Sequence, residues 1–385
     1  MPGAPRPDRL GALLCGGGVI ACLWLPFVLY KGNRILPGVP HGMYEALPPA
    51  VMPALLAALV LAAAGALFAR DARWRLAGAL LGLAALAFAV GAAGTALTPA
   101  GNKVVRVAPA SGFWLLLLCL ALLATDAVTR LRPRPGTRVI LLAGMLALLW
   151  MALASGHFDD LSFMREYAVN AERFARELRA HALLALGSLA AAALFALPLG
   201  LLCHRLPRLR GAALGVLNLV QTIPAIALFG ILMAPLAALA AASPLAAALG
   251  IRGIGAAPAV IALFLYSLLP IVANTVAGLA RVSPAAVEAA RGMGMTAGQI
   301  LARVELPLAL PVILTGVRIV LVQNIGLVTV AALIGAGGLG AFVFQGIGQT
   351  AIDLVLLGAL PIILLAFCAA VLLDALIEVI DKVPA

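Results

Sequence analysis

Acidic and histidine side chains within apolar sequence are the residues that could carry proton or metal chemistry in this chain. They are Asp126, Asp353, Asp374, Glu378, His181 and His204. Each lies near the end of a long apolar stretch, whereas ion-coupled carriers place such groups near the middle of the membrane. No paired acids, metal-spaced histidines or Ser/His/Asp set occurs at a shared depth. We therefore expect no catalytic residue, no metal and no cofactor, and an ion-coupled secondary transporter remains an alternative.

Two glycine patterns decide whether the chain could bind a nucleotide. Gly335-x-Gly337-x-x-Gly340 matches a dinucleotide fingerprint, but an apolar stretch of membrane length precedes it in place of a strand. We therefore interpret these glycines as a tight turn. A phosphate-binding GK[ST] motif is excluded, because none of the three lysines follows a glycine. Any ATP-driven function needs an ATPase on another chain.

A polar stretch, residues 288–307, separates two long apolar ones. Just before it, Ser283-Pro284 is typical of a helix start, with a hydroxyl N-cap followed by proline in the first turn. Gly294 favours the left-handed turn that ends a helix. Thr296 and Gln299 have the spacing of a capping box that opens a second short helix. The sequence therefore predicts two short helices joined by a turn across one membrane face.

The polar stretch also resembles the cytoplasmic coupling loop of binding-protein-dependent ABC importer permeases. The matching pattern is EAA-x3-G-x9-I-x-LP, with Val304 in the isoleucine position. The resemblance implies that a loop at about 281–308 docks on an ATPase. The residues that it assigns to this coupling are Glu288, Ala289, Ala290, Gly294, Leu306 and Pro307. An ordinary amphipathic loop is the alternative.

Further segments resemble the osmoprotectant branch of these permeases, which takes up glycine betaine, carnitine and choline. They read LVQTIPAIA (219–227), ALFLYSLLP (262–270) and AALIGAGGLG (331–340). The resemblance implies a five-helix type I core that forms a pore with a second permease copy or homologue. It also implies cytoplasmic ABC ATPase subunits and an extracytoplasmic substrate-binding protein. A permease for another small solute, such as an amino acid, remains an alternative.

Composition places the whole chain in the membrane. It is 64% hydrophobic and 11% charged, with a mean hydropathy of +1.14, whereas soluble domains are about 45–50% apolar. The net charge of +11 comes from basic residues in short loops, so we explain it by topology and expect no nucleic-acid partner. The sequence therefore predicts an all-α polytopic membrane protein in contact with the lipid bilayer.

Ten apolar stretches are long enough to cross a bilayer. They lie near 10–30, 50–69, 77–97, 109–128, 139–155, 182–203, 213–240, 257–280, 310–334 and 354–377. Alternate loops are rich in arginine, so the positive-inside rule predicts that both termini and the coupling loop lie in the cytoplasm. The resemblance implies that the membrane is the bacterial inner membrane. Residues 156–180 predict an amphipathic helix that leads into the sixth span.

The motifs divide the chain into two predicted parts. Residues 1–155 hold five spans and no motif that we can name, and we interpret them as the additional N-terminal region of a longer variety of osmoprotectant permease. Residues 156–385 hold the other five spans and every recognisable motif. We expect the second part to be the permease core, and the role of the first part stays open.

Polar residues and prolines within the core spans are candidates for the substrate pathway. They are Gln221, Thr222, Pro224, Tyr266, Asn274 and Asn324. Hydrogen bonding between helices is the alternative for each polar one. Pro224 and Pro270 are expected to kink their helices, and Arg318 is expected to pair or to reach the interface. The core contains no tryptophan and few tyrosines, so we expect selection of a quaternary ammonium to reside in the binding protein.

Overall fold

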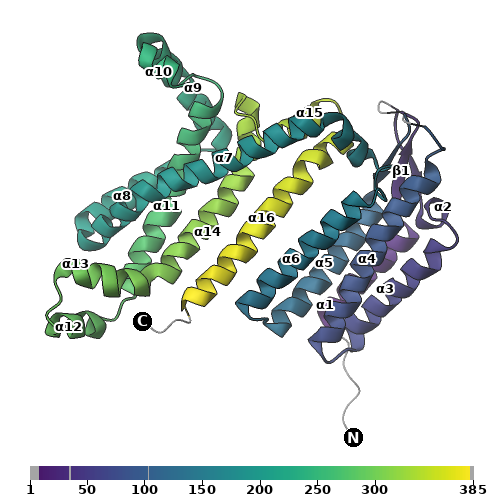
Figure 1. Cartoon of the computed structure of the whole chain (residues 1–385), viewed down its shortest axis with the longest axis horizontal. Helices are drawn as coiled ribbons and strands as arrows, with labels where there is room; N and C mark the ends of the chain where they lie inside the picture. Colours follow the sequence, from purple (N-terminus) through teal and green to yellow (C-terminus); the bar gives the residue numbers. More distant parts are fainter. Residues whose placement is uncertain (1–7, 34–35, 103, 382–385) are drawn as a thin grey trace, which may run out of the picture. The chain divides into compact units, whose positions relative to one another are not determined.

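The computed structural model describes residues 8–33, 36–102 and 104–381. The chain forms two compact units, residues 1–169 and 170–385. Within the described residues, nine helices are long and apolar enough to cross a membrane, and a tenth apolar helix, α1 (Arg9–Leu23), is shorter (Figure 1). The predicted polytopic helical fold is confirmed. The two chain ends lie outside the described residues, so the predicted side of the termini stays a prediction.

Five apolar helices form the body of the N-terminal unit. They are α1 (Arg9–Leu23), α3 (Val51–Phe68), α4 (Ala72–Leu97), α5 (Ser111–Leu131) and α6 (Pro135–Ala154); a short helix, α2 (Met43–Ala46), precedes α3. Their alanine and leucine content favours helix, and α4 packs between α3 and α5. Small residues allow this close packing, since a Cβ on Gly78 would lie 3.2 Å from the Cα of Ala62.

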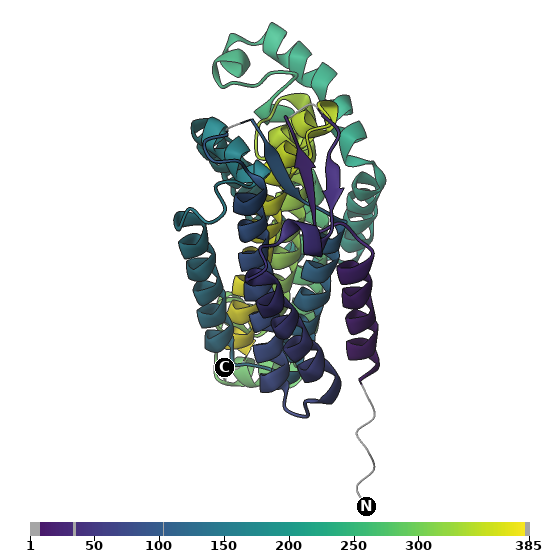
Figure 2. The same cartoon turned by 90° about the vertical axis from the view of Figure 1, so that its right-hand side faces the viewer.

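A three-stranded antiparallel sheet lies at one end of these helices (Figure 2). β1 (Val28–Lys31) pairs with β2 (Val39–His41) and with β3 (Arg106–Pro109). The sheet corrects the predicted first span, because helix α1 stops at Leu23 and the apolar run continues as β1. Val28, the first residue of β1, is fully buried in the unit's core. The hydrophobicity of this segment therefore reflects burial of the strand itself.

Four charged side chains join three helix ends of the N-terminal unit. Asp8, the N-cap of α1, accepts from Arg75 of α4 at 2.6 Å and from Arg130 of α5 at 2.5 Å. Arg130 also pairs with Asp126 at 2.8 Å. The hydrogen bond from Arg75 and the positive charge of Arg130 lower the pKa of Asp8 to about 2, although burial opposes the shift. Asp8 therefore stays ionised at physiological pH.

The C-terminal unit is built on five long helical segments and several short ones. The long segments are α7 (Ser162–Arg205), α8 (Pro207–Thr222) with α9 (Ala225–Ala242), α11 (Ala256–Ala280), α14 (Leu306–Ala331) and α16 (Ile352–Asp381). The short helices are α10 (Pro244–Ala248), α12 (Pro284–Gly292), α13 (Ala297–Ile300) and α15 (Gly340–Gly348). α14 packs against α11 on one side and α16 on the other, and α12 and α10 lie at opposite ends of the unit (Figure 1).

Two predicted elements of the C-terminal unit differ in detail from the structure. The expected amphipathic helix at 156–180 is the first part of α7, whose backbone is non-helical at Asn170. The expected single span at 213–240 is two helices, because α8 ends at Thr222 and α9 starts at Ala225. Pro224 was expected to kink one helix. It interrupts the helix completely, since Ile223 is extended and proline has no N–H to continue the ladder.

The charge network predicts a difference between two neighbouring arginines of α4. Arg75→Met removes the ion pair with Asp8 and the 2.9 Å bond from Nε to the carbonyl of Ala69. We expect it to lower the free energy of unfolding by about 2 kcal/mol. Arg73→Met, two residues away on an exposed site, is the matched control and should change stability little. Thermal unfolding of the purified protein in detergent measures both, and equal melting temperatures for the two variants would contradict the assignment.

Candidate functional site

The predicted coupling loop is formed by α12, α13 and the turns around them. Pro284 stands in the first turn of α12, as predicted, but Ser283 occupies the N-cap position without a side-chain hydrogen bond. The helix ends with Gly294 in the left-handed conformation, at φ +80°. The N–H of Met295 bonds to the carbonyl of Ala290, and that of Gly294 to the carbonyl of Arg291. This pair of bonds is the Schellman motif that ends many helices at glycine.

The second half of the loop begins with the predicted capping box. The N–H of Thr296 donates to Oε1 of Gln299 at 2.9 Å, and the N–H of Gln299 donates to Oγ1 of Thr296 at 3.4 Å. A π-helical turn, Leu301–Glu305, then leads directly into α14. Such turns often occur at functional sites. Here the turn connects the loop to a membrane-spanning helix without an intervening flexible segment.

The loop presents most of its motif residues at the surface. Glu288, Ala289 and Gly294 are exposed, as are Leu306 and Pro307 at the start of α14. Ala290 is buried, and its part in the coupling stays a prediction. A depression of about 260 Å³ behind α12 is lined in part by Glu288, Arg291, His204 and Glu305.

One ion pair fixes the end of the loop to the adjacent span. Nη2 of Arg205, the last residue of α7, lies 3.7 Å from Oε2 of Glu305, the last residue of the π-helical turn. Arg205 is about half exposed, so this contact adds little stability. It does connect α7 to the point at which the loop enters α14.

Two of the predicted pathway residues form a clamp at the proline interruptions. Proline at position 270 has no N–H, so the carbonyl of Tyr266, one turn earlier in α11, has no helical donor. Nε2 of Gln221 donates to that carbonyl at 2.8 Å. The hydroxyl of Tyr266 in turn donates to the carbonyl of Ile223, at the break between α8 and α9. The two side chains thus satisfy backbone groups that lipid could not.

Asn324 lies inside the helix packing of the C-terminal unit. Its Nδ2 donates at 3.0 Å to the hydroxyl of Ser188 on α7 and at 3.0 Å to that of Ser267 on α11. All three side chains are fully buried. Asn324 therefore ties three helices together in this conformation, which is the interhelical role considered above, and its place in a pathway stays a prediction.

The remaining pathway candidates are more accessible. Thr222 and Pro224 are exposed at the α8–α9 break. Asn274 is half-buried and donates to the carbonyl of Pro270 at 2.8 Å. A Cβ on Gly316 would lie 2.8 Å from the Cβ of Asn274, so α14 approaches α11 closely at this position.

The glycine-rich segment before α15 is the predicted tight turn. Gly335, Gly337 and Gly338 all have positive φ. Oε2 of Glu177, on α7, accepts from the N–H of Gly338 at 2.7 Å. A Cβ on Gly340 would lie 2.1 Å from the carbonyl oxygen of Thr329, so the close approach itself requires glycine here.

Two arginines make contacts whose partners sequence reasoning did not identify. Arg173 of α7 donates to Oε1 of Gln345 at 2.7 Å, and its guanidinium lies 4.8 Å from the ring centre of Phe342. Arg318 of α14 forms an ion pair with Asp374 of α16. Pairing of Arg318 was expected and is confirmed, but its partner could not be identified, because the two residues lie far apart in sequence.

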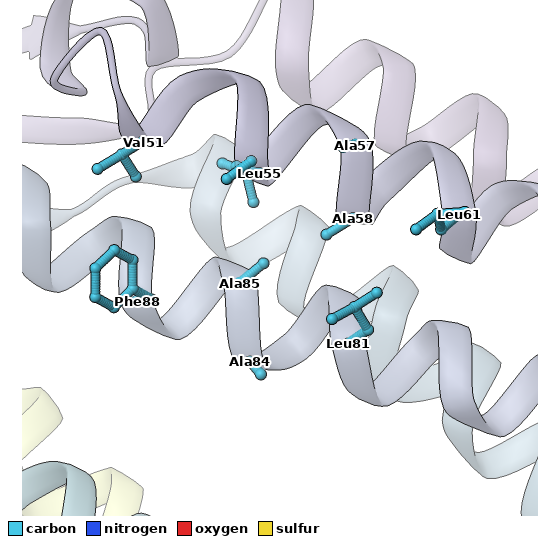
Figure 3. A pocket seen from close by; sticks show the side chains of 10 residues that line it. Val51, Leu55, Ala57, Ala58, Leu61, Leu81, Ala84, Ala85 and Phe88 are labelled. Carbon is cyan, nitrogen blue, oxygen red and sulfur yellow. The ribbon is translucent and has the colours of Figure 1, made fainter.

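A depression in the N-terminal unit carries no polar chemistry. It has a volume of about 430 Å³ and lies between α3 and α4, lined only by alanine, leucine, valine and phenylalanine side chains (Figure 3). The described residues also contain no group of three or more His, Cys, Asp or Glu side chains that could hold a metal. The candidate site is therefore the coupling loop together with the polar groups of the C-terminal unit.

The proline clamp gives a prediction for a double-mutant cycle. Gln221→Leu leaves the carbonyl of Tyr266 buried without a donor and should lower the free energy of unfolding by about 1–3 kcal/mol. Pro270→Ala restores an N–H that can reach the same carbonyl. In that background Gln221→Leu should cost at least about 1 kcal/mol less. Thermal unfolding in detergent measures the four proteins, and an equal cost of Gln221→Leu in both backgrounds would show that the bond is unimportant.

Comparison with known proteins matches both parts of the chain. Residues 8–164 match the family described as the N-terminal domain of the ABC transporter permease YehY. Residues 196–382 match the family described as the inner membrane component of binding-protein-dependent transport systems. The first match covers most of the N-terminal unit, and the second contains the coupling loop.

Two similar relatives are permeases of osmoprotectant importers. The osmoprotectant import permease protein OsmW of Salmonella typhimurium is 47% identical over 175 residues, which are 46% of this chain and 76% of the relative. The glycine betaine/carnitine/choline transport system permease protein OpuCD of Bacillus subtilis is 38% identical over 204 residues, 53% of this chain and 82% of the relative. An inward-facing structure of the MetNI methionine ABC transporter contains a chain that aligns with 54% of this chain, with 20% identity and a TM-score of 0.48. The chain belongs to the family of inner membrane permease components of binding-protein-dependent ABC importers.

Proposed function

We propose that this permease passes a small quaternary-ammonium osmoprotectant, of the glycine betaine or choline type, into the cytoplasm. A separate ABC ATPase drives the passage, and an extracytoplasmic binding protein delivers the substrate. A second permease copy or a homologue completes the pore. The coupling loop is the observation that carries this proposal, since its exposed motif residues stand on α12, in the turn after it and at the start of α14.

The loop is suited to transmit movement. Its first helix ends in a Schellman motif and its second begins with a capping box, so both helices have fixed ends. The π-helical turn and the Arg205–Glu305 contact connect it to α14 and α7. A displacement of α12 by an ATPase would therefore act on α14 through the continuous π-helical turn. The basic loops on the same predicted side support a cytoplasmic position for this surface.

The choice of substrate rests on the relatives. Their names describe import of osmoprotectants, of carnitine and of choline. Glycine betaine, carnitine and choline share a quaternary ammonium group. The C-terminal unit, from residue 170 onward, contains no tryptophan and Tyr266 as its single tyrosine, so it is poor in the two ring types that suit an aromatic cage for that group best. We therefore assign tight selection to the binding protein and passage to this chain.

The N-terminal part is proposed to be a separate module added to the pore-forming core. Every motif of the core follows residue 155, and the first 169 residues form their own compact unit with their own buried core. Its role is not assigned by any residue described above.

The coupling loop gives a prediction at Gly294. A Cβ at this position would meet no atom within 4 Å, but the φ of +80° is strained for any β-branched residue. Gly294→Val should distort the turn and reduce ATP-driven uptake by at least about tenfold, with normal membrane insertion. Uptake in vesicles, normalised to the amount of inserted complex, measures the effect.

Two further variants separate strain from crowding at the ATPase. Gly298→Val changes an exposed glycine of α13, in the same loop, that has no atom within 4 Å and no positive φ, so it controls for added bulk. Gly294→Asn adds a side chain that tolerates the left-handed conformation and should retain more uptake than Gly294→Val. Normal uptake by Gly294→Val, at normal expression, would count against the role of this loop.

The substrate is tested with the whole complex in proteoliposomes. We expect ATP-dependent uptake of glycine betaine or choline that requires the binding protein, and no uptake with a hydrolysis-deficient ATPase. Uptake of an amino acid such as methionine, without uptake of any quaternary amine, would refute the proposed substrate and retain the proposed class. Uptake that continues without ATP would refute the class as well.

A further inference from the structure

An ion pair stands within two of the membrane-spanning helices of the C-terminal unit. Arg318 lies at the middle of α14, and Asp374 lies seven residues before the last residue of α16. The side chains remain 33% and 44% exposed, so the described residues leave the pair partly open. Both helices are otherwise strongly apolar.

Arg318 lies on the side of α14 that faces α16, opposite the side that packs toward α11. The buried stripe of α14 runs through Gly316, Val320 and Asn324, which pack toward α7 and α11. Arg318 is two residues, or about 200° around the helix, from both Gly316 and Val320. Thr315, three residues before Arg318, lies on the same side of the helix and is half-buried.

A charged pair on this face is costly if it contacts lipid. Ionisable groups within membrane helices almost always face a protein interior or a water-filled cavity, where they mark a substrate or ion pathway. The alternative is a purely structural ion pair, a lock that holds α14 against α16. However, such a lock stabilises the fold little more than a well-packed apolar pair would. It would also have no need to stay accessible to a ligand.

We propose that Arg318 and Asp374 form a charge-complementary site for a zwitterion on the translocation pathway, an inference that rests on the proposed function. A betaine carries a carboxylate and a quaternary ammonium within one small molecule. The guanidinium of Arg318 can bind the carboxylate through two parallel hydrogen bonds, while the carboxylate of Asp374 faces the ammonium. The substrate replaces the ion pair with two new ones, so neither charge within the membrane is left without a counter-charge.

The site predicts a preference between related substrates. Choline has the quaternary ammonium but no carboxylate. If Asp374 turns to choline, Arg318 loses its partner, so passage of the zwitterion is favoured over passage of the cation. The binding protein also influences the ratio of the two uptake rates, but the same binding protein serves every variant. A ratio normalised to the unmodified complex therefore reports the permease.

The test is the initial rate of glycine betaine and choline uptake by the complete importer in proteoliposomes. Arg318→Met removes the carboxylate partner, and we expect betaine uptake to fall about tenfold or more, with a smaller fall for choline. Asp374→Asn should lower uptake of both. Arg318→Met/Asp374→Leu removes both charges together and should also lose betaine uptake.

The double variant separates the site from a structural lock. A lock tolerates replacement of both charges by apolar side chains, so wild-type uptake of both substrates by the double variant would overturn the proposal. Basal ATP hydrolysis and the elution volume of the complex should stay unchanged, which confirms assembly. Arg130→Met, which removes an ion pair from the N-terminal unit, is the control and should leave the betaine to choline ratio unchanged.

Failure of the proposed substrate can be distinguished from failure of this site. If the unmodified importer takes up an amino acid and no betaine, the substrate proposal fails, but the amino acid is itself a zwitterion. Its uptake should then fall about tenfold in the double variant. Undiminished uptake of that amino acid by the double variant would overturn the site.

Discussion

Backbone polar groups in the membrane must be satisfied by the protein, and the C-terminal unit depends on this constraint where proline interrupts its helices. Pro270 leaves the carbonyl of Tyr266 without a helical donor. The break before Pro224 likewise interrupts the helical hydrogen bonds at the carbonyl of Ile223, and an unsatisfied carbonyl in the membrane costs free energy. Gln221 and the hydroxyl of Tyr266 supply the missing donors. The interrupted α8–α9 segment is therefore held against α11 by side chains from both partners.

Other polar contacts of the unit also join its segments through hydrogen bonds. Asn324 joins α7, α11 and α14 through two serine hydroxyls, and Glu177 accepts from the N–H of Gly338 in the glycine-rich turn. Each joins segments that are distant in sequence, so the apolar helices acquire defined neighbours. At the coupling-loop end, fixed helix ends and the Arg205–Glu305 contact connect the exposed motif to this framework. The framework can therefore convey a movement of the loop to the helices that would line a pore.

The features that depend on local sequence could be predicted well. The start of α12 at Pro284, the left-handed Gly294 and the capping box of Thr296 and Gln299 each follow from a few adjacent residues. Most of the membrane helices follow from the length of apolar runs. The coupling motif also indicated the family before any geometry was known.

Contacts between distant segments could not be predicted. β1 continues the apolar run of the first helix, so the spacing of apolar residues does not distinguish strand from helix there. Its partner β3 follows only after two further membrane helices. The partner of Arg318 is a residue of another helix, and hydropathy alone does not pair charges. The clamp between Gln221 and Tyr266 was missed for the same reason, although both residues were selected as polar groups in apolar sequence.

The central claim is that the loop around α12 receives the ATPase, and site-specific photo-crosslinking in the intact complex tests it most directly. Met293 at the turn after α12 and Leu245 on α10 are both highly exposed, at 74% and 70%. The helices α12 and α10 lie at opposite ends of the C-terminal unit (Figure 1). A photoreactive side chain at Met293 should give an adduct with the ATPase subunit, and one at Leu245 should not. An ATPase adduct from Leu245 and none from Met293 would contradict the account.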